Sequence, residues 1–121
     1  MIQGTLESTG LDTNSFDVVL LDSVIEHVAS PAALLRNVHC ALRNRGVVIV
    51  VTPKLNGPSY RLHGADWNGV PARLHTFLFT AKTLRLLMRE TGFRVLRWSC
   101  RNRILDDILI LWGRKVADSK D

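Results

Sequence analysis

The sequence contains no apolar run near the ~20 residues that a membrane-spanning helix requires. Its opening segment, Met1–Asp17, is polar and acidic, unlike a signal peptide. Cysteine is scarce, because only Cys40 and Cys100 are present and they form no CxxC pair. The histidines show no standard metal-ligand spacing. These absences argue against a membrane span, a disulfide framework and a regular zinc site, and they predict a reduced, cytoplasmic protein.

The composition is that of one globular domain with an excess of positive charge. The 121 residues fit a single domain, 1–121, with a frayed polar tail over 116–121. Hydrophobic residues make up 46% of the chain and charged residues 22%, which favours a packed core over disorder. Much of the net charge of +5 comes late, from Arg94, Arg97, Arg101, Arg103, Arg114 and Lys115. Because no basic run exceeds two consecutive residues, a solvated surface is the favoured interpretation.

The first half of the chain predicts a strand, a helix and a second strand with short connections. The runs 16–21 and 47–51 are continuous and aliphatic, which is typical of strands covered on both faces in a parallel sheet. Ser30 and Pro31 suit the start of a helix, and Gly46 suits its left-handed end. Such a crossover joins parallel strands along a right-handed path. The apolar stripe expected on this helix is Leu34, Leu35, Val38, Ala41 and Leu42.

The second half predicts a long loop, a helix and an antiparallel hairpin. Residues 53–79 have no period, and an irregular stretch of this length is usually functional. A helix is expected to begin at Thr80 and to stop at Gly92. Strands are expected over 93–100 and 107–112, and the short link between them favours antiparallel pairing. The inward-facing residues of the first of these strands are expected to be Phe93, Val95, Leu96 and Trp98.

The segment 16–31 carries a family resemblance. It reads FDVVLLDSVIEHVASP, which resembles the post-strand motif of class I S-adenosylmethionine-dependent methyltransferases. The resemblance runs in register from about Gly4 to Lys115 and is closest to the small-molecule branch that includes ubiquinone-pathway O-methyltransferases. The other matching segments are Gly46–Pro53, Leu74–His75, Phe77–Phe79, Thr83–Leu84, Thr91–Phe93 and Asp107–Lys115.

The resemblance implies an α/β fold that holds the last four strands of a Rossmann-like methyltransferase sheet. Two of these strands are parallel, a C-terminal hairpin follows, and helices flank the sheet. The GxGxG loop and the acidic residue that bind the cofactor in this family have no counterpart in the sequence. The family's strand order leaves 16–21 as an apolar edge, and such an edge invites pairing with another chain. We therefore expect a homodimer or an N-terminal partner segment that covers this edge.

The resemblance implies S-adenosylmethionine as the cofactor and places its contacts in two segments. In the family, the segment that matches 4–7 often carries an aspartate that bonds the adenine, and Thr5 stands near that position here. The segment after the matched strand would lie against the methionine part of the cofactor, since ligands bind beyond the carboxyl ends of such strands. The implied cofactor-binding residues are Thr5, Leu6, Leu21, Asp22 and Ser23.

Two histidines are candidate catalytic bases, because histidine accepts a proton near neutral pH. His27 follows Glu26 close to the predicted helix, where capping or packing is the alternative role. His75 borders the substrate pocket by resemblance, with a buried, backbone-bonded ring as the alternative. The expected substrate-binding residues are Glu26, Tyr60, Arg61 and Trp67. Trp67 could equally pin the long loop to the sheet.

We expect methyl transfer from S-adenosylmethionine to a small-molecule acceptor, by this chain as a fragment or completed by another segment. No residue decides between oxygen, nitrogen and carbon acceptors. A catalytically inactive binding or assembly module of the same fold is one alternative. A basic nucleic-acid-binding domain is the other, although nucleic acid is the less favoured partner. Its binding residues would be Arg94, Arg97, Arg101 and Arg103.

Overall fold

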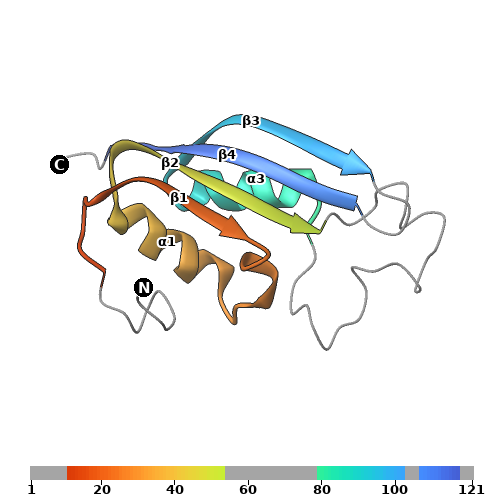
Figure 1. The fold of residues 1–121 in the computed structure, drawn as a ribbon, viewed down its shortest axis with the longest axis horizontal. Helices are drawn as coiled ribbons and strands as arrows, with labels where there is room; N and C mark the ends of the chain where they lie inside the picture. The colour runs from red at the N-terminus through yellow and green to blue at the C-terminus, as the bar shows by residue number, and fades with distance from the viewer. Residues whose placement is uncertain (1–10, 54–78, 103–106, 118–121) are drawn as a thin grey trace.

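The computed structural model describes residues 11–53, 79–102 and 107–117 (Figure 1). Residues 54–78 of the expected loop 53–79, and most of the tail 116–121, therefore lie outside the described residues. In chain order the elements are β1 (Phe16–Asp22), the short 3-10 helix η1 (Ile25–His27), α1 (Pro31–Ala41), β2 (Leu42–Pro53), α3 (Ala81–Glu90), β3 (Phe93–Asn102) and β4 (Asp107–Lys115).

The four strands form one sheet in the order β1-β2-β4-β3. β1 pairs with β2 in parallel, with Leu20 opposite Ile49, and α1 connects the two strands. The crossover predicted from the two apolar runs is thereby confirmed. β4 is antiparallel to both β2 and β3, which confirms the predicted hairpin. β1 stands at the end of the order and is an edge strand, as the resemblance implied.

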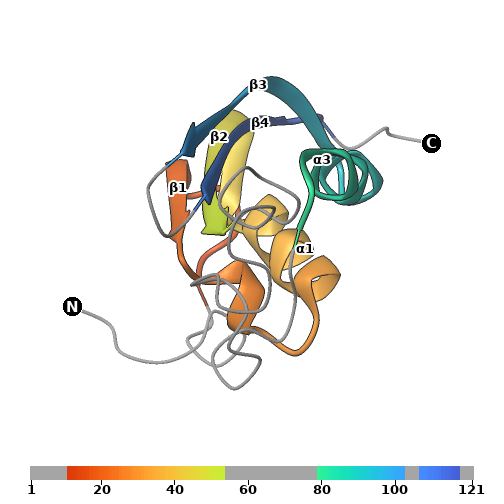
Figure 2. The same ribbon diagram turned by 90° about the vertical axis from the view of Figure 1, so that its right-hand side faces the viewer.

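Both helices cover the same face of the sheet (Figures 1 and 2). On this face alternate residues of β2 are buried, namely Val48, Val50 and Thr52. The side chains that the two helices bury completely include Leu35, Val38, Leu84 and Met88. One layer of helices on one sheet is the minimal arrangement that buries the apolar side of each element.

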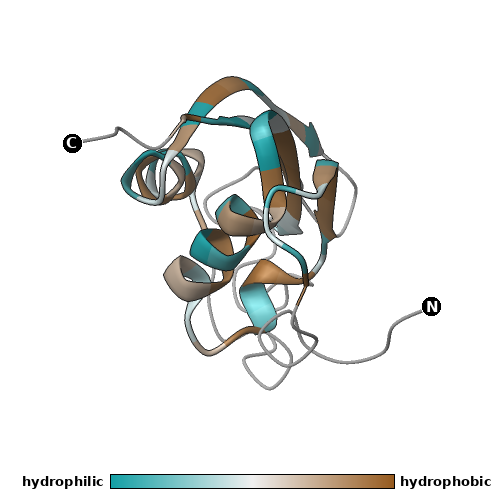
Figure 3. Cartoon of the chain, turned by 90° about the vertical axis from the view of Figure 1, so that its left-hand side faces the viewer, coloured by the Kyte–Doolittle hydropathy of each residue, from teal (hydrophilic) through white to brown (hydrophobic). Residues whose placement is uncertain are grey.

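The opposite face of the sheet is bare within the described residues. On β1 the side chains of Phe16, Val18 and Leu20 are 38%, 56% and 58% exposed. Figure 3 shows this edge strand as a brown, apolar ribbon. A strand that is apolar on both faces is normally covered on both faces. This surface is therefore as apolar as a protein interior, although no described residue covers it.

Side chains fix the start of each helix. Ser30 Oγ accepts the N–H of Ala33 at 3.2 Å, which confirms Ser30 as the cap of α1. Thr80 and Thr83 form a reciprocal capping box on α3, with N–H to hydroxyl distances of 3.1 and 3.0 Å. The predicted stop of α3 is confirmed at Gly92, which has φ 95°.

The end of α1 differs from the expectation. The helix stops at Ala41, and β2 begins at once with Leu42, which pairs with Phe16 of β1. The left-handed residue in this turn is Arg45, with φ 67°, so the left-handed end expected at Gly46 was wrong. A Cβ on Gly46 would lie 2.8 Å from the carbonyl oxygen of Arg43, which shows that this glycine allows close backbone approach.

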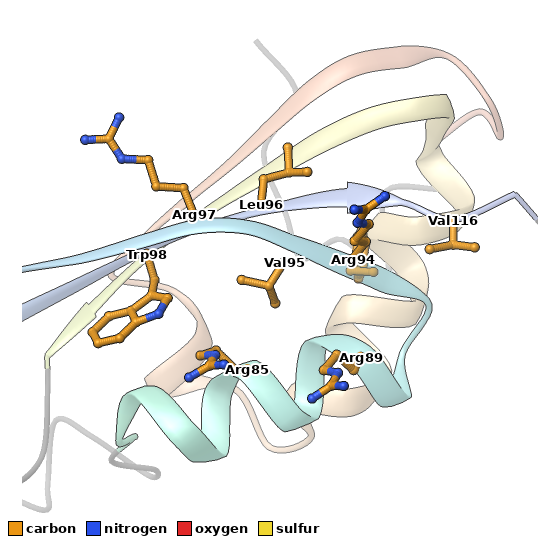
Figure 4. Close-up of a pocket in the computed structure, with 9 residues that line it drawn as sticks. Arg85, Arg89, Arg94, Val95, Leu96, Arg97, Trp98 and Val116 are labelled. Carbon is orange, nitrogen blue, oxygen red and sulfur yellow. The ribbon is translucent and has the colours of Figure 1, made fainter.

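β3 departs from a simple alternation of inward and outward residues. Its pairing with β4 shifts between Val95 and Arg97, which is a bulge. Leu96 and Arg97 consequently point away from α3, whereas Val95 and Trp98 point toward it (Figure 4). The expectation that Leu96 faces inward was wrong, and Trp98 faces α3 without entering the core. Both side chains are 44% exposed.

At the amino ends of β1 and β2, the last carbonyl groups of α1 accept hydrogen bonds from residues that precede β1. The N–H groups of Asn14 and Ser15 donate to the last carbonyl groups of this helix, each at 2.9 Å. Lys115 Nζ donates to the carbonyl oxygen of Leu42 at 2.9 Å and to the side-chain oxygen of Asn14 at 3.2 Å. Lys115 is only 4% exposed, so its ammonium group is buried at this end of the sheet and links β4 to the chain around β1 and β2.

Candidate functional site

The carboxyl ends of β1 and β2 meet at the other end of the sheet, the place where open α/β folds bind ligands. The chain turns sharply after β1, because Ser23 adopts a left-handed φ of 57°. The N–H of Ser23 donates to the carbonyl oxygen of Val51 at 2.9 Å, which ties this turn to β2. Backbone in such a sparsely populated conformation often occurs at functional sites. The turn leads directly into η1, which carries Glu26 and His27.

Glu26 is fully buried at 0% exposure, which is rare for a carboxylate. Thr52, near the end of β2, donates its hydroxyl to Glu26 Oε2 at 2.8 Å. The other oxygen, Oε1, is buried and has no hydrogen-bond partner among the described residues. An unpaired buried acceptor costs about 1–3 kcal/mol, and more when it is charged. The fold therefore keeps at this place a charged group whose hydrogen-bonding capacity it does not fill.

His27 lies beside this carboxylate and reaches the surface. Its side chain is 43% exposed, and its Nε2 lies 3.6 Å from Glu26 Oε1. Thr52, Glu26 and His27 thus form a series from the buried strand end to solvent, which we call the Thr52–Glu26–His27 cluster. A histidine next to a buried carboxylate can accept a proton, because the carboxylate stabilises the imidazolium that results.

Comparison with known proteins identifies the family. Residues 3–97 match the model of a methyltransferase domain, which is well over half of the chain. The chain belongs to the methyltransferase domain family. No curated protein matches the sequence significantly.

Solved structures share the fold of this methyltransferase domain. A SAM-dependent methyltransferase from Methanosarcina mazei superposes with a TM-score of 0.71 at 16% identity, over 95% of this chain and 66% of that one. One from Thermotoga maritima gives 0.71 at 20% identity, over 95% and 63%. The Burkholderia thailandensis 1,6-didemethyltoxoflavin-N1-methyltransferase, solved with bound S-adenosylhomocysteine, gives 0.69 at 20%, over 89% and 48%. This chain thus spans no more than two thirds of each of these three structures, and identities this low show the fold alone.

The methyltransferase domain brings five of the sequence-predicted site residues together at the carboxyl ends of its parallel strands. Asp22 is exposed at the end of β1 and accepts a hydrogen bond from Ser23 Oγ at 3.3 Å. Glu26 and His27 follow in η1. Leu21 is buried in the core, so its side chain is not open to a ligand. The predicted residues that lie outside the described residues are Thr5, Leu6, Tyr60, Arg61, Trp67 and His75.

Thr52 is the member of the cluster that the sequence analysis missed as a site residue. Thr52–Pro53 reads locally as the end of an apolar strand, because proline cannot donate to the ladder. The available signal was a hydroxyl residue directly after the aliphatic run 47–51, at a position that the strand alternation buries. A buried hydroxyl needs a hydrogen-bond partner, and Glu26 is that partner.

Within ranges 11–53, 79–102 and 107–117, no three His, Cys, Asp or Glu side chains gather in a way that could hold a metal ion. No helix in these ranges is long and apolar enough to cross a membrane. Both cysteines are unbridged; Cys40 is exposed and Cys100 is half-buried.

Proposed function

We propose that this chain is the acceptor-side part of an S-adenosylmethionine-dependent methyltransferase and acts together with a further segment. The observation that carries this proposal is Glu26 Oε1, which is buried where two parallel strands end and accepts no hydrogen bond from the described residues. A buried polar atom without a partner calls for an explanation, and a ligand that donates to it supplies one. The family membership of the chain makes the cofactor or the methyl acceptor the natural ligand.

S-adenosylmethionine fits the chemistry of this end of the sheet. The cofactor carries a sulfonium and an ammonium group, and Glu26 Oε1 is a buried carboxylate oxygen to which no described residue donates a hydrogen bond. Asp22 and Ser23, with the backbone of Leu21, are the proposed contacts for its methionine part. Thr5 and Leu6 are the proposed contacts for its adenine part. When bound, the cofactor supplies the electrophilic methyl group, and the protein mainly aligns the acceptor.

His27 is the proposed base. Its exposed ring can accept the proton of an acceptor hydroxyl or amine, while Glu26, 3.6 Å away, stabilises the imidazolium. Thr52 holds the carboxylate through Oε2, so the cluster is oriented before an acceptor arrives. His75 stays a second candidate base. The proposed acceptor contacts are Glu26, Tyr60, Arg61 and Trp67.

A small-molecule acceptor, in a branch like that of the ubiquinone-pathway O-methyltransferases, is part of the proposal. The motif in 16–31 supports it, because that motif resembles this branch most closely. The Burkholderia thailandensis structure supports the substrate class, since that enzyme was solved with 1,6-didemethyltoxoflavin, a small molecule.

The further segment is proposed to cover β1. Phe16, Val18 and Leu20 are exposed on this edge strand, and an apolar edge has unpaired backbone groups ready for another strand. An N-terminal segment or a second copy of this chain would supply that strand. A structural neighbour from Haloferax volcanii is known in complex with the Trm112 methyltransferase activator, so assembly with another chain occurs on this fold.

A catalytically inactive binding or assembly module is the second candidate. The fold itself favours no single chemistry, because the [4+2]-cyclase SpnF superposes on this chain with a TM-score of 0.73 at 17% identity.

Calorimetric titration of the full chain with S-adenosylmethionine separates the two candidates. We expect saturable heat, and we expect Glu26→Gln to weaken binding by at least about tenfold, since a charged hydrogen-bond partner is lost. Asp17→Asn is the matched control, because it removes an exposed carboxylate of β1 that pairs with Arg43. Equal affinities for both variants would exclude Glu26 from the site. Absence of heat at millimolar ligand would favour the inactive module.

A further inference from the structure

The positive charge of the chain is concentrated in one segment. Residues 81–101, which form α3 and most of β3, contain six Lys and Arg residues and one acidic residue, Glu90. This segment therefore carries a formal charge of +5, which equals the net charge of the whole chain. Elsewhere the ten basic and ten acidic residues balance. A basic surface that is merely solvated, as the sequence analysis favoured, does not account for this concentration of charge.

The segment folds so that its arginines line one groove. Arg85 and Arg89 project from α3, Arg94 and Trp98 lie on β3, and the space between the two elements measures about 660 Å³ (Figure 4). Phe93 and Val95 are among the apolar residues that line it. We call this the arginine groove. It is built on β3, at the sheet edge opposite β1, and is therefore separate from the Thr52–Glu26–His27 cluster.

The arginines of the groove have no anionic partner within the part of the chain that is described. No carboxylate in those ranges lies within 4.0 Å of the guanidinium groups of Arg85, Arg89 or Arg94, whereas Arg43 on the opposite side of the sheet pairs with Asp17 at 3.4 Å. Like charges gathered in a concave surface raise the local potential and attract anions. The groove is thus complementary to a partner that carries several negative charges.

Trp98 limits which anionic partners fit the groove, because it places an exposed aromatic ring beside the arginines. Its indole is 44% exposed, and Arg85 Cζ lies 5.8 Å from the centroid of its ring. The bulge at Leu96 turns Trp98 toward α3 and Arg97 away from it. Arg97 still borders the groove, and its guanidinium lies over the Trp112 ring at 5.4 Å. An exposed aromatic ring among arginines is the combination that binds single-stranded nucleic acid, with bases stacked on the ring and phosphates held by the cations.

We propose that the arginine groove binds single-stranded nucleic acid. Arg85, Arg89 and Arg94 contact the phosphodiester backbone, and Trp98 stacks on a base. An acidic protein segment would satisfy the arginines as well, but it has no use for the half-exposed indole. The groove differs from the set suggested by sequence alone, because Arg85 and Arg89 come from α3. Arg94 and Arg97 of that set also line it, whereas Arg101 does not.

Fluorescence anisotropy of a labelled single-stranded oligouridylate with the full chain, over a series of salt concentrations, tests the proposal. Affinity should fall with salt, with a slope of about −0.7 in log K against log salt for each phosphate contact. Arg85→Gln with Arg89→Gln should weaken binding at least about tenfold and make the slope shallower by about 1.4. Trp98→Leu should weaken binding at least about fivefold without changing the slope.

The matched control is the pair Arg36→Gln with Arg45→Gln, which removes the same charge from exposed residues outside the groove. An equal loss of affinity in this control would reduce the effect to net charge and overturn the proposal. Absence of salt-dependent binding would also overturn it. A third result would also overturn it. If polyglutamate displaces the oligouridylate and the Trp98→Leu variant binds the oligouridylate as tightly as the wild type does, the groove binds an acidic protein instead. Trp98→Phe, which keeps a ring, should retain most of the affinity if Trp98→Leu fails to fold.

Discussion

The two ends of the sheet treat a buried charge in opposite ways. At the amino ends of the parallel strands, Lys115 donates to Leu42 and to Asn14, so two acceptors hold its ammonium group. At the carboxyl ends, Glu26 accepts one hydrogen bond, from Thr52, and its other oxygen has no hydrogen-bond partner among the described residues. Both side chains are buried, at 4% and 0% exposure. The comparison indicates that the amino end serves stability, while the carboxyl end keeps a local cost, which the ligand of the proposed function would remove.

Lys115→Met should produce the largest change in stability. Methionine keeps much of the side-chain volume, but Leu42 and Asn14 lose the donor that reaches them. We expect the free energy of unfolding to fall by about 3 kcal/mol, measured by urea unfolding followed by circular dichroism. Lys82→Met on the exposed side of α3 is the control and should change it by less than about 0.5 kcal/mol. If Lys115→Met lowers the free energy of unfolding by less than about 1 kcal/mol, the amino end does not serve stability as this comparison holds.

Thr52→Val should produce a smaller loss at the other end of the sheet. Valine keeps the shape of threonine, but the Glu26 carboxylate loses its donor at 2.8 Å. We expect the free energy of unfolding to fall by about 2 kcal/mol, since this is a hydrogen bond to a charged acceptor. Thr13→Val, at an exposed position, is the control. The effects of Thr52→Val and Lys115→Met should add within about 0.5 kcal/mol in the double variant, and strong coupling would show that the ends are not independent.

The outline of the fold was predictable because its signals are local. Two aliphatic runs, the Ser30 cap and the stop at Gly92 were each visible within a few residues, and each is confirmed. The end of α1 was not predictable in the same way. Pairing of Leu42 with Phe16 of β1 overrides the local preference of Gly46, and that pairing joins residues far apart in sequence.

The candidate site was predictable only in part. Glu26 and His27 stood out because they lie in a motif with a family resemblance. Their connection to Thr52 depends on two parallel strands ending side by side, which no local pattern records. The exposure of Trp98 was hidden for a similar reason, because a one-residue bulge changes which face each later residue occupies.

Glu26→Gln tests most directly the claim that Glu26 is retained for a ligand. Thermal unfolding of the wild-type chain and the variant should be compared with and without S-adenosylmethionine. We expect the variant without ligand to be as stable as the wild type or up to about 1 kcal/mol more stable, because a neutral amide is cheaper to bury. We expect the ligand to raise the unfolding temperature of the wild type more than that of the variant. A variant destabilised by more than about 2 kcal/mol that the ligand stabilises as strongly as the wild type would contradict the account.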